Sequence, residues 1–217
     1  MKSNRFAILV ITVLIMFSLQ GCDNSWSVDF TTVHDIDDWK EQDYNIPYLH
    51  SLSSDGLFID GDILTAPIGF SNDFTLAITF VLNNIEPMAV SAFEVFLNQG
   101  EDFPSDEYIK IQFKTMAGAV TTGNYYISET APPVLLDSGA SIPGLRSIGL
   151  NVLTFEKKGT HVTVHMNEGL LCDAYLSSYS PTWYFPILYV HGAATGRMFI
   201  KSIKVDYIGP TVPLPWF

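Results

Sequence analysis

Short segments in which apolar and polar residues alternate are the feature that most constrains this chain, because a side-chain period of two is that of a half-buried β-strand. The alternation is clean in Tyr108–Lys114. Residues 150–156 and 160–166 alternate as well, and the turn Lys157–Gly159 separates them, which is typical of a β-hairpin. These segments predict antiparallel β-structure.

Similar runs of β-branched and aromatic residues recur along the chain, with turn residues about every eight to twelve positions. Phe74–Leu82 is long and nearly continuously apolar, which predicts a central strand. We interpret Asp60-Gly61-Asp62 as a hairpin turn in which Gly61 supplies a positive φ. Helical periodicity is not convincing anywhere beyond the amino-terminal leader, so the prediction is an all-β sandwich or barrel. Further strands are predicted at residues 56–59, 63–66, 92–97, 170–176 and 197–208.

The amino-terminal leader is distinct from this pattern. Lys2 and Arg5 precede an uncharged, mostly apolar stretch that runs from Phe6 to Leu19. Such a stretch is at the upper end of a signal-peptide core of roughly 7–15 residues and is shorter than the ~20 residues of a spanning helix. We therefore predict a signal peptide over residues 1–21.

The end of the leader, Leu19-Gln20-Gly21-Cys22, resembles the lipobox of bacterial lipoproteins. That resemblance implies cleavage before Cys22, acylation of its thiol and contact with membrane lipid through the acyl chains. The protein is then expected in the bacterial cell envelope, with the choice of inner or outer membrane open. An ordinary secretory signal with a chance cysteine is the alternative.

The charge of the chain is strongly negative, at −12 for 217 residues. Removal of Lys2 and Arg5 with the leader leaves nine basic and 23 acidic residues, which is −14. A field of this sign repels phosphate backbones, so nucleic acid is excluded as an expected partner. Cys172, in an apolar run, is expected to be a buried small hydrophobe rather than a nucleophile.

The mature chain divides simply. Residues 22–27 are expected to be the lipidated amino terminus and a short tether, and residues 28–209 a single β-sandwich domain. Residues 210–217 form a proline-rich tail, because its three prolines lack the amide donors that would extend a ladder.

Three features of the mature chain together resemble the concanavalin A-like jelly-roll superfamily, which includes laminin-G-like domains, lectins and laminarinase-type glycoside hydrolases. They are Asp29-Phe30 followed by Trp39, the segment Phe70–Leu82, and the hairpin Thr154–Leu170 with the closing strand Phe199–Tyr207. The resemblance implies an antiparallel β-sandwich. It does not fix the function, because unrelated activities share this fold.

A structural calcium ion is a further implication of the resemblance, because members often hold one between an early loop and the last strand. The matching carboxylates here are Asp60, Asp62 and Asp206, and calcium prefers such oxygen ligands. The alternative for Asp60 and Asp62 is the hairpin turn already described.

Hydrolases of this superfamily carry alternating acids on one strand, and a retaining glycosidase needs two carboxyl groups about 5–5.5 Å apart. That spacing is absent here, since Glu94 is a lone acid between Phe93 and Val95. Glu101 lies in an acidic segment that we interpret as a solvated loop. We therefore interpret the domain as non-catalytic, and keep a hydrolase that uses Glu94 or Glu101 as the alternative.

Aromatic residues near the end of the chain suggest a ligand surface. Trp183 and Tyr184 lie between two prolines, with Tyr179 close by, and such rings can stack on sugars. Core packing is the competing interpretation for each ring. Glycan binding is thus the hypothesis for this domain, and an envelope scaffold that contacts other proteins without a small ligand is a third possibility.

His161 and His165 suggest a metal site only if they lie on a helix. On a strand, two residues four apart are roughly 13 Å from each other, too far to bind one ion. The β-branched residues between them favour a strand, so we do not assign a metal to this pair.

Overall fold

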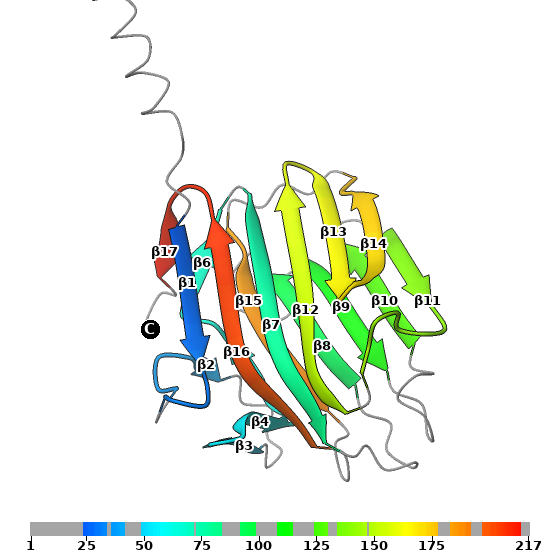
Figure 1. The fold of residues 1–217 in the computed structure, drawn as a ribbon. Coiled ribbons are helices and arrows are strands. Elements are labelled where there is room, and N and C mark those ends of the chain that lie inside the picture. The colour runs from blue at the N-terminus through cyan, green and yellow to red at the C-terminus, as the bar shows by residue number, and fades with distance from the viewer. Residues whose placement is uncertain are drawn as a thin grey trace, which may run out of the picture.

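The computed structural model describes residues 24–33, 36–41, 49–71, 73–83, 92–98, 108–114, 124–129, 134–146, 148–177, 183–191 and 197–213. Within these ranges every helix or strand assigned is a β-strand, and the strand pairs are antiparallel, which confirms the predicted fold class. In this described part of the chain, no helix has the length and apolar character to cross a membrane. The strands form two stacked sheets and one small extra pair (Figure 1).

The larger sheet has eight strands in the order β14-β13-β12-β7-β16-β4-β3, with β1 added beside β16. Its strands are β1 (Asn24–Asp29), β3 (Leu49–Ser53), β4 (Gly56–Asp60), β7 (Phe74–Asn83), β12 (Gly149–Lys158), β13 (His161–Met166), β14 (Gly169–Tyr175) and β16 (Arg197–Tyr207). The apolar strand β7 lies between β12 and β16, which confirms its predicted central position.

The second sheet has seven strands in the order β11-β10-β9-β8-β15-β5-β2. Its strands are β2 (Lys40–Glu41), β5 (Ile63–Thr65), β8 (Ala92–Asn98), β9 (Tyr108–Lys114), β10 (Asn124–Glu129), β11 (Val134–Gly139) and β15 (Phe185–His191). A separate two-stranded pair joins β6 (Ile68–Phe70) to β17 (Thr211–Pro213).

The main hydrophobic core lies between the two large sheets. Alternate residues of each strand point into it, for example Ile78 and Phe155 from one sheet and Val95 and Ile111 from the other. This arrangement follows directly from the period of two, because every second side chain of a strand points to the same face. The predicted hairpin is confirmed as β12 and β13, with Gly159 at φ 59° in its turn.

The structure corrects the interpretation of Asp60-Gly61-Asp62. Gly61 has the expected positive φ of 77°, but the turn carries the chain from one sheet to the other and forms no hairpin. Strand β4 is already flanked by β3 and β16, so β5 pairs instead with β15 and β2. The Gly61 N–H donates to the carbonyl of Val190 across this crossing, at 2.7 Å.

The strands also extend beyond both predicted boundaries of the sandwich. Strand β1 begins at Asn24, so residues 24–27, expected as tether, pair with β16. The proline-rich tail contributes β17, in which Thr211–Pro213 pairs with β6. This is possible because Pro210 precedes that strand and Pro213 ends it, where missing donors cost little.

The tight β3–β4 turn generates a stability prediction. Gly56 has φ 111°, and a Cβ there would lie 2.4 Å from the carbonyl oxygen of Ile200. We expect Gly56→Ala to lower the free energy of unfolding by about 3 kcal/mol, measured by urea titration. Gly159→Ala is the control, since its Cβ would meet nothing within 4 Å, and it should cost only about 1 kcal/mol. Equal losses would show that the contact with Ile200 does not matter.

Candidate functional site

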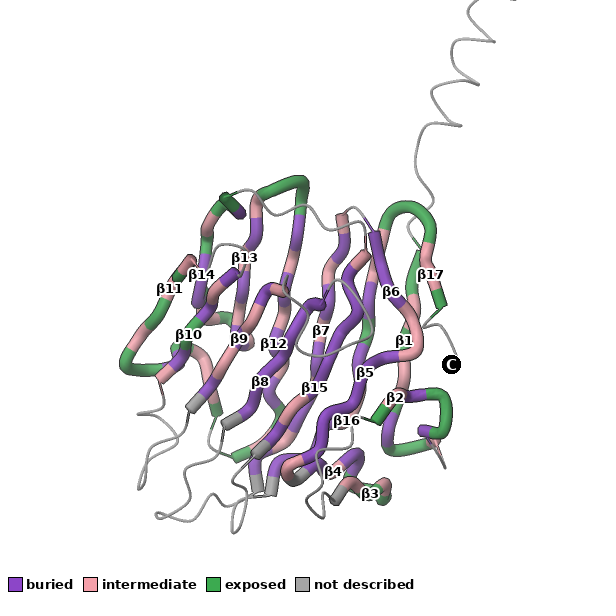
Figure 2. The backbone as a smooth tube through the Cα atoms, turned by 180° about the vertical axis from the view of Figure 1, so that it is seen from behind, coloured by how far each residue is buried: buried purple, intermediate pink, exposed green. Residues whose placement is uncertain are grey.

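The face of the seven-stranded sheet that points away from the main core is here called the outer face. It carries a second apolar cluster of Ile63, Phe96 and Ile187, against which Tyr108 and Tyr189 pack. Figure 2 views the molecule from this side, where buried positions run along β8, β15 and β5. The centre of the outer face is therefore shielded from solvent, unlike the exposed face expected for a simple two-sheet sandwich.

Four side chains form a straight row across this face, here called the outer-face row. Tyr126 of β10 is paired with Gln112 of β9, Gln112 with Glu94 of β8, and Glu94 with Tyr189 of β15. Residues that pair directly across antiparallel strands point to the same face. With strands about 4.8 Å apart, the row spans roughly 14 Å.

Glu94 is the polar centre of the row and is only 4% exposed. Its Oε2 lies 2.9 Å from the Nζ of Lys110, and the side-chain amide of Gln112 donates to its Oε1. The Lys110 ammonium also lies 5.2 Å from the centroid of the Phe96 ring. A buried carboxylate needs such partners, because an unpaired charge in an apolar environment is strongly destabilising.

The outward positions of β8 bear on catalysis. Glu94, Phe96 and Asn98 point to the outer face, so this strand presents one acid there and not an alternating set. The other acid proposed from the sequence, Glu101, lies outside the described residues. The described outer face thus offers a fixed hydrogen-bonding centre flanked by tyrosines.

The aromatic residues singled out in the sequence have different positions. Tyr184 is a core residue, 1% exposed, whose ring packs on Phe74 at 5.3 Å, so its assignment to a ligand surface is wrong. The reason is that Tyr184 pairs with Phe70 and leads directly into β15, where alternate residues point inward. Trp183 precedes it and is half-buried, and Tyr179 lies outside the described residues.

The three carboxylates proposed for calcium are not brought together. Strand β16 pairs with β4 at Phe199. Asp206 lies seven positions further along β16, which is roughly 23 Å from that pair. It forms an ion pair with Lys204 at 2.7 Å. Asp62 lies just after β4, in the crossing to the other sheet, and the side chain of Asp60 is outside the described residues.

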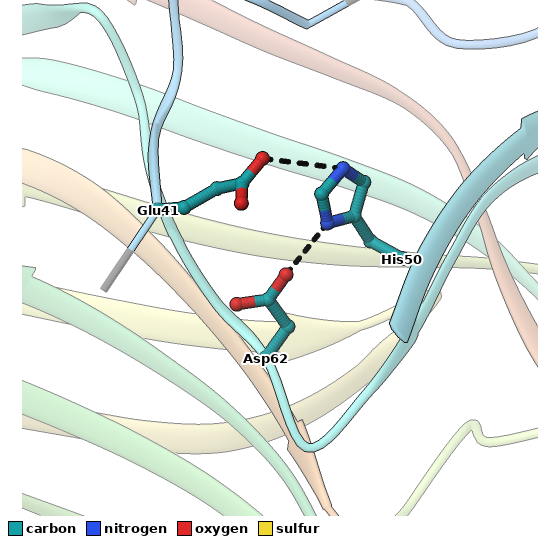
Figure 3. A group of neighbouring side chains, drawn as sticks. All are labelled: Glu41, His50 and Asp62. Carbon is teal, nitrogen blue, oxygen red and sulfur yellow. Dashed lines mark hydrogen bonds and ion pairs between the residues drawn. The ribbon is translucent and has the colours of Figure 1, made fainter. Parts of the chain in front are cut away.

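Asp62 belongs instead to a cluster with His50 and Glu41 (Figure 3). Its Oδ2 lies 2.6 Å from His50 Nδ1, and Glu41 Oε1 lies 3.3 Å from His50 Nε2. Strand β3 supplies His50 from the eight-stranded sheet, while β2 supplies Glu41 from the seven-stranded sheet. Sequence reasoning missed this cluster, because no motif links three residues that meet only when the sheets stack.

The histidines of β13 are on a strand, as predicted. The Nε2 of His161 lies 2.6 Å from Asp173 Oδ1, and its ring stacks on Tyr175 with the centroids 4.8 Å apart. The nearby Cys172 is buried as expected, and burial, with smaller contributions from Asp137 and Asp173, raises the pKa of its thiol to about 12. A thiol that stays protonated is a poor nucleophile.

Comparison with known proteins identifies the fold and no sequence family. No family model matches the chain, and no curated protein sequence matches it. Among solved structures, the laminarinase catalytic domain from Thermotoga maritima is similar with a TM-score of 0.64 and 12% identity, covering 85% of this chain and 98% of that one.

Two other similar structures are a transglycosylase and a sugar-binding domain. The Crh5 transglycosylase in complex with NAG has a TM-score of 0.59 and 11% identity, over 86% of this chain and 85% of that chain. The exoplasmic/lumenal domain of VIP36, bound to Ca²⁺ and Man3GlcNAc, has a TM-score of 0.54 and 10% identity, over 79% and 84%. At these identities the similarity shows the fold, a concanavalin A-like jelly roll, which confirms that expectation.

The buried ion pair generates a second prediction. We expect Lys110→Met to lower the free energy of unfolding by about 2–3 kcal/mol, because it removes the ammonium that lies 2.9 Å from the buried Glu94 carboxylate. Lys204→Met removes the cation of an exposed pair with Asp206 and should change stability by at most about 0.5 kcal/mol. Chemical denaturation of both variants measures the difference, and a Lys110→Met variant as stable as the control would contradict a buried pair.

Proposed function

We propose that this concanavalin A-like β-sandwich binds a glycan on its outer face, along the outer-face row. The observation that carries the proposal is the row itself, in which a paired carboxylate and an amide lie between two tyrosines on adjacent strands. The similar structures, which include a laminarinase and two proteins in complex with sugars, support the proposal.

The chemistry of the row suits a sugar chain. Tyrosine rings offer flat apolar faces for stacking on sugar rings, while their hydroxyls and the Gln112 amide can exchange hydrogen bonds with sugar hydroxyls. A length of roughly 14 Å across four strands accommodates a short oligosaccharide rather than a single ring. Because Lys110 and Gln112 already hold Glu94 in place, little ordering of the centre of the row is needed when a ligand binds beside the exposed Tyr126 ring.

Binding is tested with Tyr126, the member of the row that is 39% exposed. We expect Tyr126→Ala to weaken binding roughly tenfold, because a well-stacked ring contributes about 0.5–1.5 kcal/mol beyond its buried area. A glycan array first identifies a ligand, and affinity electrophoresis in gels containing that glycan in soluble form then measures the change. The control is Tyr175→Ala, since Tyr175 is 71% exposed on the other sheet.

Two outcomes would contradict glycan binding at the row. Equal retardation of parent, Tyr126→Ala and Tyr175→Ala would place any glycan site elsewhere. An absence of binding to every glycan would favour the third possibility, a scaffold that contacts other envelope proteins.

A glycoside hydrolase is the second candidate, and the similar structures favour it. They include a lichenase, a laminarinase and a Bacillus licheniformis β-glucanase. In such an enzyme Glu94 would be one of the two required carboxyl groups. Release of reducing sugar from β-glucans by the parent, and its loss in Glu94→Gln with an unchanged melting temperature, would establish the hydrolase and overturn a binding module.

We also propose that Cys22 carries an acyl anchor in the cell envelope. Strand β1 begins at Asn24 and pairs with the last residue of β16, Tyr207. An anchor on Cys22 would therefore leave one residue, Asp23, between the lipid and the sheet, and would hold this end of the sandwich against the bilayer.

Acylation is tested by partition in Triton X-114 and by incorporation of labelled palmitate. We expect the parent in the detergent phase with label, and Cys22→Ser in the aqueous phase without it, because acyl chains provide the membrane affinity. Cys172→Ser is the control and should behave like the parent. Label that persists in Cys22→Ser would rule out this anchor.

A further inference from the structure

We propose that Glu41 and His50 bind a divalent transition-metal ion, best matched by Zn²⁺, at the edge where the two sheets meet, with Asp62 orienting the histidine. This inference is independent of glycan binding. It stands on the geometry of the cluster and on the chemistry of its donor atoms, both visible in Figure 3.

The spacing of two donor atoms suits an ion between them. Glu41 Oε1 and His50 Nε2 are 3.3 Å apart, longer than the usual N–H···O hydrogen bond of about 2.7–3.2 Å. Two ligands of a tetrahedral zinc ion, each about 2.1 Å from the metal, lie roughly 3.4 Å from each other. The two atoms form an ion pair in the structure, and their separation is also that of two ligands of one zinc ion.

Asp62 contacts the ring nitrogen of His50 that does not face Glu41. A histidine that binds a metal through one nitrogen usually donates its other N–H to a carboxylate, which fixes the tautomer and the ring orientation. The Nδ1 of His50 lies 2.6 Å from Asp62 Oδ2. Asp62 is itself held, because its Oδ1 accepts the N–H of Ile63 at 2.8 Å and the residue is 4% exposed. With Nδ1 protonated, the lone pair of Nε2 is directed to the side of Glu41.

The donor set selects the class of ion. Imidazole nitrogen suits zinc, copper and nickel, whereas calcium takes six to eight oxygen ligands. Glu41 is exposed and His50 is partly exposed, so an ion can enter and water can fill its remaining positions. Because Glu41 comes from one sheet and His50 from the other, a bound ion would link the two sheets at their edge.

The test uses the full chain without an affinity tag, purified in detergent and stripped with a chelator. We expect isothermal titration with ZnCl₂ to show one site, and added Zn²⁺ to raise the melting temperature by several degrees, because an ion bound only to the folded state stabilises it. Added Ca²⁺ should give a much smaller shift. Glu41→Gln, a change at an exposed position, should bind Zn²⁺ at least tenfold more weakly, and Asp62→Asn should weaken it tenfold or more.

The matched control is His161→Ala, since His161 also contacts a carboxylate, Asp173, at 2.6 Å but belongs to no cluster of three such groups among the described residues. It should bind Zn²⁺ like the parent. The proposal is overturned if the parent binds no Zn²⁺, if Glu41→Gln binds it as tightly as the parent, or if Ca²⁺ gives an equal shift. An equal loss of Zn²⁺ affinity in His161→Ala would show that the ion binds elsewhere.

Discussion

The inward packing of alternate side chains between the two sheets is the constraint on which the other features depend. Phe93 and Val95 fill the core from β8, so Glu94 between them must point to the outer face. The same rule directs Gln112 outward from between Ile111 and Phe113 on β9. A slip of one residue in either strand would bury these polar groups in the core and expose the apolar ones. The packing of the core therefore also fixes the register of the outer-face row.

The sequence predicts the strands in which alternation is clean and says less about those in which it is not. Tyr108–Lys114 was predicted with its observed bounds, because every second residue there is polar. Strand β15 was missed, because both of its faces are buried and it contains Pro186, which usually argues against a central strand. Tyr184 directly precedes this strand, so a sequence interpretation without β15 could not place its ring in the core.

Contacts between distant strands were beyond the sequence for a different reason. His50 of β3 belongs to one sheet and Glu41 of β2 to the other. They meet with Asp62 where the turn at Gly61 passes from one sheet to the other. A local interpretation of that turn as a hairpin keeps both of its flanking strands in one sheet, so it cannot bring the three residues together. The error about the turn and the missed cluster therefore have one cause.

The short segment after Gly61 connects the two proposed sites physically. Asp62 contacts His50 with one carboxylate oxygen and holds the N–H of Ile63 with the other, and Ile63 is paired directly with Tyr189 of the outer-face row. A shift of Asp62 would therefore be passed to the end of the row through one strand pair. The backbone of Glu41 pairs with Leu64 of β5, but its side chain is exposed and contacts Asp62 only through the imidazole of His50. Substituting Glu41 alone thus removes a metal ligand while leaving the strand that supports Tyr189 in place.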